Sequence, residues 1–204
     1  DYDVDGATSS ALLARYLSSF GVKPEIYIPD RMKEGYGPNN GAMEWFKERD
    51  VKLVVTVDCG TAAHGPLAYA ASLGLDVVVL DHHIGSAEQP KAHAVVNPNR
   101  IDESSPHTNL AAVGVTFLFL VAVNRVLREK EFFKTQQAPD LRNWLDLVAL
   151  GTICDVVPLT GLNRAFVSQG LKAMGFHSNQ GLKALSAVAR IAPEYTPYHA
   201  GFML

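Results

Sequence analysis

The sequence is poor in cysteine, has no large excess of either charge, and contains no apolar run long enough to cross a bilayer. Its 204 residues include two cysteines, Cys59 and Cys154. Two are too few for the disulfide framework of a small secreted protein or for a zinc-finger ligand set. We therefore expect a reducing compartment, the cytoplasm. The 18 basic and 21 acidic residues give a formal charge of -3, which argues against a protein that coats nucleic acid through its overall field but is compatible with a local basic groove.

Several signatures of known chemistry are also missing. The longest charge-free apolar stretch, Leu110 to Val123, is too short to span a membrane and predicts a buried helix. The sequence has no G-x-x-x-x-G-K-[ST] phosphate loop, no G-x-G-x-x-G dinucleotide fingerprint and no G-x-S-x-G nucleophile elbow. The acidic N-terminus is unlike a signal peptide. Because 48% of the residues are hydrophobic, an ordinary globular core is still expected, and the chemistry must rest on other residues.

Short apolar runs alternate with helical patterns through the first hundred residues, which predicts an α/β fold with a parallel sheet. Strands are predicted at 25–28, 53–57, 77–80 and 94–96. One helix is predicted before the first strand, at 7–20, and two between the strands, at 40–49 and 66–73. The later part is mostly helical, with helices predicted at 110–128, 141–150, 163–174 and 182–189. We interpret this part as a helical layer on the same core.

Acidic residues and histidines gather where predicted elements end or begin. They follow two predicted strands, precede the first helix, and follow the apolar run 147–154. Because ligands of open parallel sheets bind at the carboxyl ends of the strands, we expect these side chains to meet at one edge. The set comprises Asp1, Asp3, Asp5, Asp58, Asp81, His82, His83 and Asp155.

Crowded carboxylates repel one another, and burial raises that cost, so a divalent cation would relieve it. Carboxylate oxygens with imidazole nitrogen suit Mn²⁺, Mg²⁺ or Zn²⁺. Five or six ligands exceed the need of one open metal site, whereas two metals that share a bridging carboxylate would use them all. A pair about 3.5–4 Å apart is the usual device for displacement at phosphorus.

Each element of this set has a simpler alternative. Residues 1–6 match the D-x-D-x-D-G opening of a calcium loop, but position 12 of that loop requires Glu and is Leu12 here. Asp58 fits a helix N-cap equally well, and Asp155 fits a buried turn. The run 81–83 is harder to explain without a ligand, because three polar groups directly follow a buried strand. The remaining histidines are interpreted as surface or cap residues: His64, His93, His107, His177 and His199.

Four segments, taken together and in order, resemble the four motifs of the DHH phosphoesterases. They are Asp-Tyr-Asp-Val-Asp-Gly-Ala-Thr-Ser at 1–9, Val-Thr-Val-Asp-Cys-Gly at 55–60, Asp-His-His at 81–83 and Gly-Thr-Ile-Cys-Asp-Val-Val-Pro-Leu at 151–159. Within that family the sequence is most similar to the exonucleases that degrade single-stranded DNA from its 5′ end. The resemblance implies a parallel-sheet DHH core with a helical C-terminal part. It also implies phosphodiester hydrolysis by water activated by two divalent cations, Mn²⁺ or Mg²⁺.

The resemblance also implies roles for individual residues. His83 would contact the scissile phosphate, and Asp81 would orient an imidazole. Arg31 would hold substrate phosphate, although a surface arginine is the alternative. Thr8 and Ser9, expected at the start of the first helix, would favour a phosphate there or serve as simple N-caps. The implied metal ligands are Asp3, Asp5, Asp58, His82 and Asp155, with Asp58 as the bridge.

For the domain organisation, the resemblance implies a catalytic domain at 1–160 and a helical extension at 161–204. Two prolines at 193–197 flank a short polar stretch and mark a further expected boundary. The resemblance also implies a first strand and a preceding histidine upstream of Asp1, and a second, DNA-gripping domain downstream of Leu204. We therefore expect this chain to bind metal but to cleave long single strands weakly. The implied partners are single-stranded DNA and DNA-repair proteins, with no membrane.

Two rival functions remain open. A sister phosphoesterase would act on oligonucleotides, cyclic dinucleotides or pyrophosphate. A non-catalytic nucleic-acid-binding module would have lost its metal ligands, and the intact acids argue against that loss.

Overall fold

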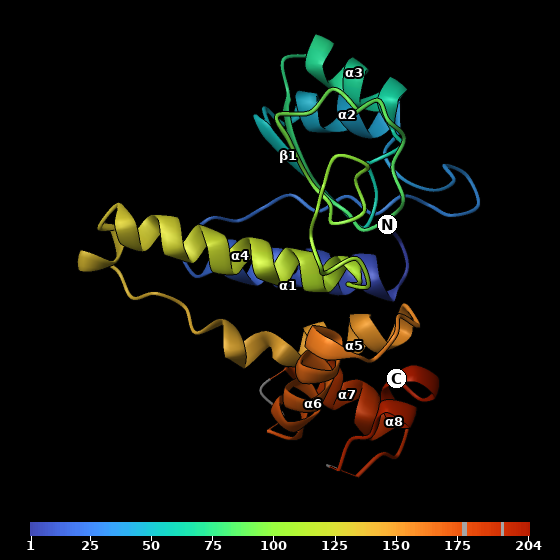
Figure 1. Cartoon of the computed structure of the whole chain (residues 1–204), viewed down its shortest axis with the longest axis vertical. Helices are drawn as coiled ribbons and strands as arrows, with labels where there is room; N and C mark the ends of the chain where they lie inside the picture. Colours follow the sequence, from blue (N-terminus) through green and yellow to red (C-terminus); the bar gives the residue numbers. More distant parts are fainter. Residues whose placement is uncertain (177–178, 193) are drawn as a thin grey trace.

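A small parallel sheet lies at one end of the molecule, and helices form the rest (Figure 1). The computed structural model describes residues 1–176, 179–192 and 194–204. The register pairs Val57 with Leu80 and Leu80 with Val96, so the strands end at a common edge. Branched apolar residues fill the first two strands, as expected for buried parallel strands. The strands lie in the order β1 (Leu53–Val57), β2 (Asp76–Leu80) and β3 (Ala94–Val96).

Four helices pack around this sheet. Met43 of α2 and Leu67 of α3 are buried with Val77 and Val79 in one core cluster. Figure 1 shows α1 and α4 running side by side between the sheet and the remaining helices, where they share a second cluster. The four are α1 (Val4–Ser18), α2 (Asn40–Glu48), α3 (His64–Ser72) and α4 (Ala112–Glu129).

The later part of the chain is helical, as the sequence predicts. Helix α5 packs between α1 and α6, and its contact with α6 requires glycine. A Cβ on Gly170 would lie 2.1 Å from the carbonyl oxygen of Leu145. Over the described ranges, no helix has the length and apolar character needed to cross a membrane. The elements are η1 (Phe132–Lys134), η2 (Leu141–Trp144), α5 (Leu145–Cys154), α6 (Gly161–Gly175), α7 (Gln180–Val188) and α8 (Pro197–Phe202).

Two predicted element boundaries are wrong in ways that matter for the site. Helix α1 begins at Val4, not residue 7, because Asp3 caps it. Asp155 follows a helix, α5, which extends to Cys154.

The strand predicted at 25–28 is not present. These residues are extended but lie in no ladder of the described sheet. An apolar groove of about 570 Å³ separates them from β1, and Ile26 and Ile28 stay half exposed. Prolines at 24 and 29 bracket the run, and each removes a main-chain donor.

Near the C-terminus, Pro193 of the expected boundary and His177 lie outside the described residues. His199 serves as a cap, as predicted: Thr196 and His199 form the capping box that begins α8.

Candidate metal centre

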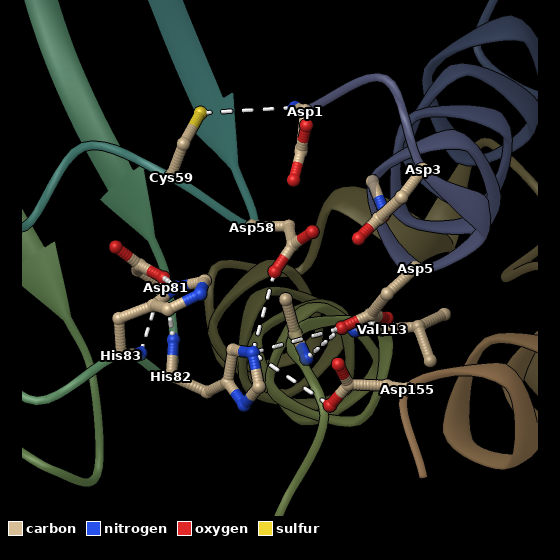
Figure 2. Close-up of polar contacts among 12 residues, drawn as sticks. Asp1, Asp3, Asp5, Asp58, Cys59, Asp81, His82, His83, Val113 and Asp155 are labelled. Carbon is tan, nitrogen blue, oxygen red and sulfur yellow. Dashed lines mark hydrogen bonds and ion pairs between the residues drawn. The ribbon is translucent and has the colours of Figure 1, made fainter. Parts of the chain in front are cut away.

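Acidic side chains and two histidines from the ends of four elements, α1, β1, β2 and α5, converge at the carboxyl edge of the sheet (Figure 2). Asp3 caps α1 and accepts a hydrogen bond from the Gly6 N–H at 2.9 Å. Asp5, in the first turn of α1, is fully buried. Its Oδ2 and Oδ1 accept hydrogen bonds from the main-chain N–H groups of Ala112 and Val113, at 2.6 and 2.8 Å. These N–H groups begin α4, so the carboxylate of Asp5 lies at the positive end of a helix.

Asp58 ends β1 in a left-handed conformation, with φ of 59°. Such a conformation is unfavourable for a residue with a side chain, and functional sites are where it tends to persist. Two hydrogen bonds hold it. The Asp58 N–H donates to Leu80 O at 2.9 Å, and the Tyr36 hydroxyl donates to Asp58 O at 2.8 Å. The carboxylate is thereby directed toward His82 (Figure 2).

His82 places its Nε2 among three carboxylates. The nitrogen lies 3.3 Å from Asp58 Oδ1, 3.7 Å from Asp155 Oδ2 and 4.0 Å from Asp5 Oδ2. It is buried yet forms no hydrogen bond with any residue that the structure describes, and the same holds for Asp155 Oδ2. One imidazole nitrogen shared by three carboxylates, and held by charge rather than by a well-directed hydrogen bond, is the arrangement expected of ligands that surround a cation.

The electrostatics of the cluster point the same way. Burial, and then the charges of Asp58 and Asp155, raise the pKa of Asp5 to about 7. Burial also raises the pKa of Asp58 and of Asp155. Burial alone would lower the pKa of His82, but the surrounding carboxylates outweigh it and raise that pKa to about 9. Protons bound to these carboxyl groups and to His82 offset the negative charge that a divalent cation would otherwise neutralise.

Asp81 holds the turn that carries both histidines. Its Oδ1 lies 2.7 Å from His83 Nδ1 and accepts the N–H groups of His82 and His83 at 2.8 and 3.2 Å. Its Oδ2 accepts the Thr61 N–H at 3.0 Å. Burial opposes ionisation of Asp81, but these hydrogen bonds from His83 and Thr61 hold its pKa well below the ordinary value. The ring of His83 is half exposed at the site.

In the described part of the chain, three overlapping groups have ligand atoms within 4.8 Å of one another. Asp58 belongs to two groups and His82 to two, which is the arrangement that two neighbouring ions would require. The five predicted ligands, Asp3, Asp5, Asp58, His82 and Asp155, all fall within these groups, and Asp1 and His83 join them. The groups are Asp58–His82–His83, Asp5–His82–Asp155 and Asp1–Asp3–Asp58.

Of the three residues predicted to hold phosphate, one is exposed beside Tyr2 and two are buried within α1. Arg31 is exposed and its guanidinium stacks on the ring of Tyr2, 5.1 Å from the ring centre. Thr8 is buried and its hydroxyl donates to Val4 O at 2.8 Å, while Ser9 is fully buried. Because α1 begins at Val4, these two hydroxyls lie inside the helix, and the expectation that they begin it is wrong. Neither is accessible to a phosphate.

Tyr36 is a site residue that the sequence reasoning missed. Besides bonding Asp58 O, its hydroxyl lies 3.3 Å from His83 Nε2. Its ring packs edge-on against the rings of Tyr2 and His83. The signal in the sequence is an aromatic residue between Gly35 and Gly37, whose φ values of 77° and 81° form a turn that few other residues adopt.

Cys59, beside Asp58, is a small buried residue, as expected. Burial raises the pKa of its thiol to about 11, which leaves it unreactive.

Comparisons with known proteins agree with this geometry. The model of the DHH family, N-terminal domain, matches residues 1–152. The single-stranded-DNA-specific exonuclease RecJ of Salmonella typhimurium is 39% identical over 198 residues, which cover 95% of this chain and 34% of that protein. RecJ of Bacillus subtilis is 40% identical over 185 residues, 91% of this chain and 22% of that protein. The chain thus spans about a third or less of the length of these relatives.

Solved structures give the same result. A crystal structure of exonuclease RecJ bound to manganese superposes with a TM-score of 0.84 and 33% identity, covering 100% of this chain and 49% of that one. RecJ in complex with Mn²⁺ from Thermus thermophilus gives a TM-score of 0.79 and 31% identity, covering 100% and 28%. The α/β fold and the family resemblance expected from the motifs are confirmed, and the chain belongs to the DHH family.

Proposed function

We propose that this chain is the catalytic core of a metal-dependent exonuclease that hydrolyses single-stranded DNA from its 5′ end, as part of repair and recombination. The observation that carries the proposal is His82 Nε2, buried among the carboxylates of Asp5, Asp58 and Asp155 without a hydrogen bond to any described residue. The proposed substrate is taken from the relatives, which are named as single-stranded-DNA-specific exonucleases.

The donor set fits two divalent cations. It is rich in carboxylate oxygen with one imidazole at its centre, a combination that accepts Mn²⁺ and Mg²⁺. Structures of RecJ are described with each of these ions. Asp58 is the candidate bridge because it belongs to two of the ligand groups. The residues that would hold the ions are Asp3, Asp5, Asp58, His82 and Asp155.

Such ions would supply an activated water and neutralise charge on the phosphoryl oxygens. The chain's own residues do the rest. Asp81 accepts the Nδ1 proton of His83 and fixes its ring, so that the half-exposed imidazole presents its other side to a phosphate. The Asp58 main chain, held by Leu80 and Tyr36, keeps the bridging carboxylate pre-oriented.

The proposal is tested by Asp58→Ala in the full-length gene product, with Mn²⁺-dependent release of nucleotides from 5′-phosphorylated single strands as the measurement. We expect release to fall to background. Asp76→Ala is the matched control, because Asp76 is exposed at the opposite end of the sheet, and it should keep full activity. Unchanged activity of the Asp58 variant would rule out the two-metal assignment.

Two parts of the chain are assigned different roles. Residues 1–160 would form the catalytic domain and 161–204 an extension toward further DNA-binding parts. We propose a cytoplasmic location and DNA-repair proteins as partners of the full-length protein. The chain by itself should bind metal and cleave long strands weakly, since groups that orient a long substrate contribute much of the rate.

The intact cluster of His82 with the carboxylates of Asp5, Asp58 and Asp155 argues against a non-catalytic binding module, which would have lost these residues. The same centre would serve a sister phosphoesterase acting on oligonucleotides, cyclic dinucleotides or pyrophosphate. A series of substrate lengths separates the two enzymes, because only the exonuclease gains activity as the strand lengthens.

A further inference from the structure

The His82–His83 turn lies on irregular backbone between β2 and β3, so no sheet ladder holds it. Its main-chain groups are bonded by side chains instead. The N–H groups of both histidines donate to Asp81. The carbonyl oxygen of His82 accepts from Asn99 Nδ2 at 2.6 Å, and that of His83 accepts from Asn97 Nδ2 at 2.8 Å. Every main-chain polar group of the two histidines therefore has a partner.

Asn97 is itself firmly held. It is buried, and its second amide hydrogen goes to Thr61 Oγ1 at 2.9 Å. Its own oxygen accepts the Asn99 N–H at 2.8 Å. Thr61 in turn donates its N–H to Asp81. Asp81, Thr61 and Asn97 thus form one circuit around the peptide of His83.

Asn99 links the turn to a second part of the site. Its Nδ2 also donates to Thr108 O at 2.9 Å, in the loop just before α4. The first N–H groups of α4 hold Asp5. The side-chain amide of Asn99 therefore ties the main chain of His82 to the loop before α4, the helix whose first N–H groups bind Asp5.

The residue between the two asparagines suits this task. Pro98 has a fixed φ and disfavours helical conformations of Asn97, which narrows the conformations of the segment that carries both amides. An asparagine amide offers two N–H donors on one rigid plane, and both asparagines use both donors. Neither alanine nor aspartate can supply such a pair.

We propose that Asn97 and Asn99 are positioning residues that hold the histidine pair at the carboxylates, Asn99 through His82 and Asn97 through His83. The inference rests on the proposed metal-dependent function for its metal and kinetic readouts. In metal sites, partners that orient a ligand from behind change metal affinity by about 10- to 100-fold when removed.

The test uses Asn97→Ala, Asn99→Ala and Asn99→Asp, with Mn²⁺ affinity measured by calorimetry and folding checked by circular dichroism. We expect each variant to lose about 10- to 100-fold in Mn²⁺ affinity. Asn99→Asp keeps the volume, replaces the two donors by acceptors and adds a negative charge, whereas Asn99→Ala removes the donors and some packing without adding charge. A loss of affinity in both variants therefore points to the shared loss of the donors. Asn99 is only partly buried, so its variants decide the matter if Asn97→Ala fails to fold. In the full-length gene product, excess Mn²⁺ should restore part of the nucleotide release.

The control is Asn124→Ala. Asn124 is also a buried asparagine with two partners, Tyr16 and Pro139, but it lies about 18 Å along α4 from the end that holds Asp5. It should lower the melting temperature and leave Mn²⁺ affinity unchanged. Folded Asn99 variants that bind Mn²⁺ within about two-fold of wild type would overturn the inference.

A second readout needs no metal. Imidazole ¹H–¹⁵N spectra of the metal-free chain should show the His82 and His83 resonances displaced in the Asn97 and Asn99 variants and unmoved in Asn124→Ala. If wild type binds no Mn²⁺, the proposed function fails, and these spectra alone decide the inference. Unmoved histidine resonances in the Asn variants would refute it.

Discussion

The carboxylate of Asp5 binds the start of a helix that lies more than a hundred residues away: its Oδ1 accepts the Val113 N–H at 2.8 Å. Its Oδ2 binds the preceding N–H and lies 4.0 Å from His82 Nε2. One buried side chain thus joins α1 to α4 and faces the candidate ions as well. The fold and the candidate site therefore share this residue.

Asp5→Asn should uncouple stability from metal binding. The amide keeps one acceptor for α4 but turns its N–H₂ group toward the second N–H. At pH 6, where the Asp5 side chain is mostly protonated and carries little charge, this should lower the metal-free free energy of unfolding by about 1–3 kcal/mol. The rise in melting temperature on adding Mn²⁺ should be largely lost. Asp146→Asn is the matched control, because Asp146 is also buried in a helix and accepts an N–H, that of Leu147 at 2.8 Å. An undiminished Mn²⁺ shift in Asp5→Asn would contradict the assignment.

The pH dependence of stability follows from the raised pKa values. Burial raises the pKa of Asp5 from 3.8 to about 7, so the stability contributed by its protonation is complete below pH 3.8 and is lost as pH rises through 7. The carboxylates raise the pKa of His82 from 6.5 to about 9, so its contribution is lost as pH rises through 9. Both effects lower stability as pH rises, Asp5 between pH 3.8 and about 7 and His82 between pH 6.5 and about 9, so His82 accounts for the fall above about pH 7.

We therefore expect the urea midpoint of the metal-free chain to fall steadily from pH 6 to 9. Saturating Mn²⁺ should stabilise the chain more at pH 8 than at pH 6, because the ion takes the place of the protons. The Asp5→Asn variant should show a shallower fall below pH 8. A midpoint in EDTA that does not change over this range would disprove the electrostatic description.

Gly151→Ala should disturb the candidate site through the packing of the helices that carry it. A Cβ at Gly151 would lie 2.3 Å from Thr8 Oγ1, 2.8 Å from Val113 Cγ1 and 3.1 Å from Asp5 Oδ1. Helices α1 and α5 would have to separate, at a cost of about 1–3 kcal/mol, and Mn²⁺ affinity should fall with them. The control is Gly65→Ala in α3, where a Cβ would meet no described atom within 4 Å. That change should be neutral or stabilise by up to about 1 kcal/mol. Equal melting temperatures for the two variants would contradict this account.

Most of the elements, and the gathering of acidic residues and histidines at one edge of the sheet, could be predicted from the sequence, because both leave local signals. Their assignment as metal ligands stays a prediction. Periodicity marks a buried strand, and an acid directly after it marks a site. The strand predicted at 25–28 is absent because a strand forms only where a neighbouring strand is available for hydrogen bonding, and the local sequence pattern does not reveal that neighbour. The prediction that Thr8 and Ser9 start the first helix was wrong because a single capping residue, Asp3, determines where α1 begins.

The supporting residues could not be found in this way. Asn97, Asn99 and Tyr36 act on the main chain of residues 14 to 22 positions away. Apart from the two glycines that flank Tyr36, nothing local distinguishes these residues from other polar residues in a loop. These contacts exist only once the tertiary fold has brought the segments together. Side chains that bind a ligand are therefore easier to predict than side chains that hold them.

Tyr36→Phe tests whether the left-handed conformation of Asp58 is maintained for the sake of the site. The variant removes the hydroxyl that donates to Asp58 O at 2.8 Å and keeps the ring against Tyr2 and His83. Burial and then the nearby acids raise the pKa of Tyr36 well above its ordinary value, so the phenol remains a donor at every working pH.

Loss of one neutral hydrogen bond should lower the free energy of unfolding by about 0.5–1.5 kcal/mol, whereas Mn²⁺ affinity should fall by about ten-fold because the candidate bridging carboxylate is no longer pre-oriented. Tyr69→Phe is the control, since that hydroxyl donates to Glu44 at 2.7 Å on the surface, and it should change neither quantity appreciably. If Tyr36→Phe loses stability without losing Mn²⁺ affinity, the hydroxyl supports the fold alone. If affinity falls far more than stability does, the strain at Asp58 is retained because it aims the carboxylate at the ions.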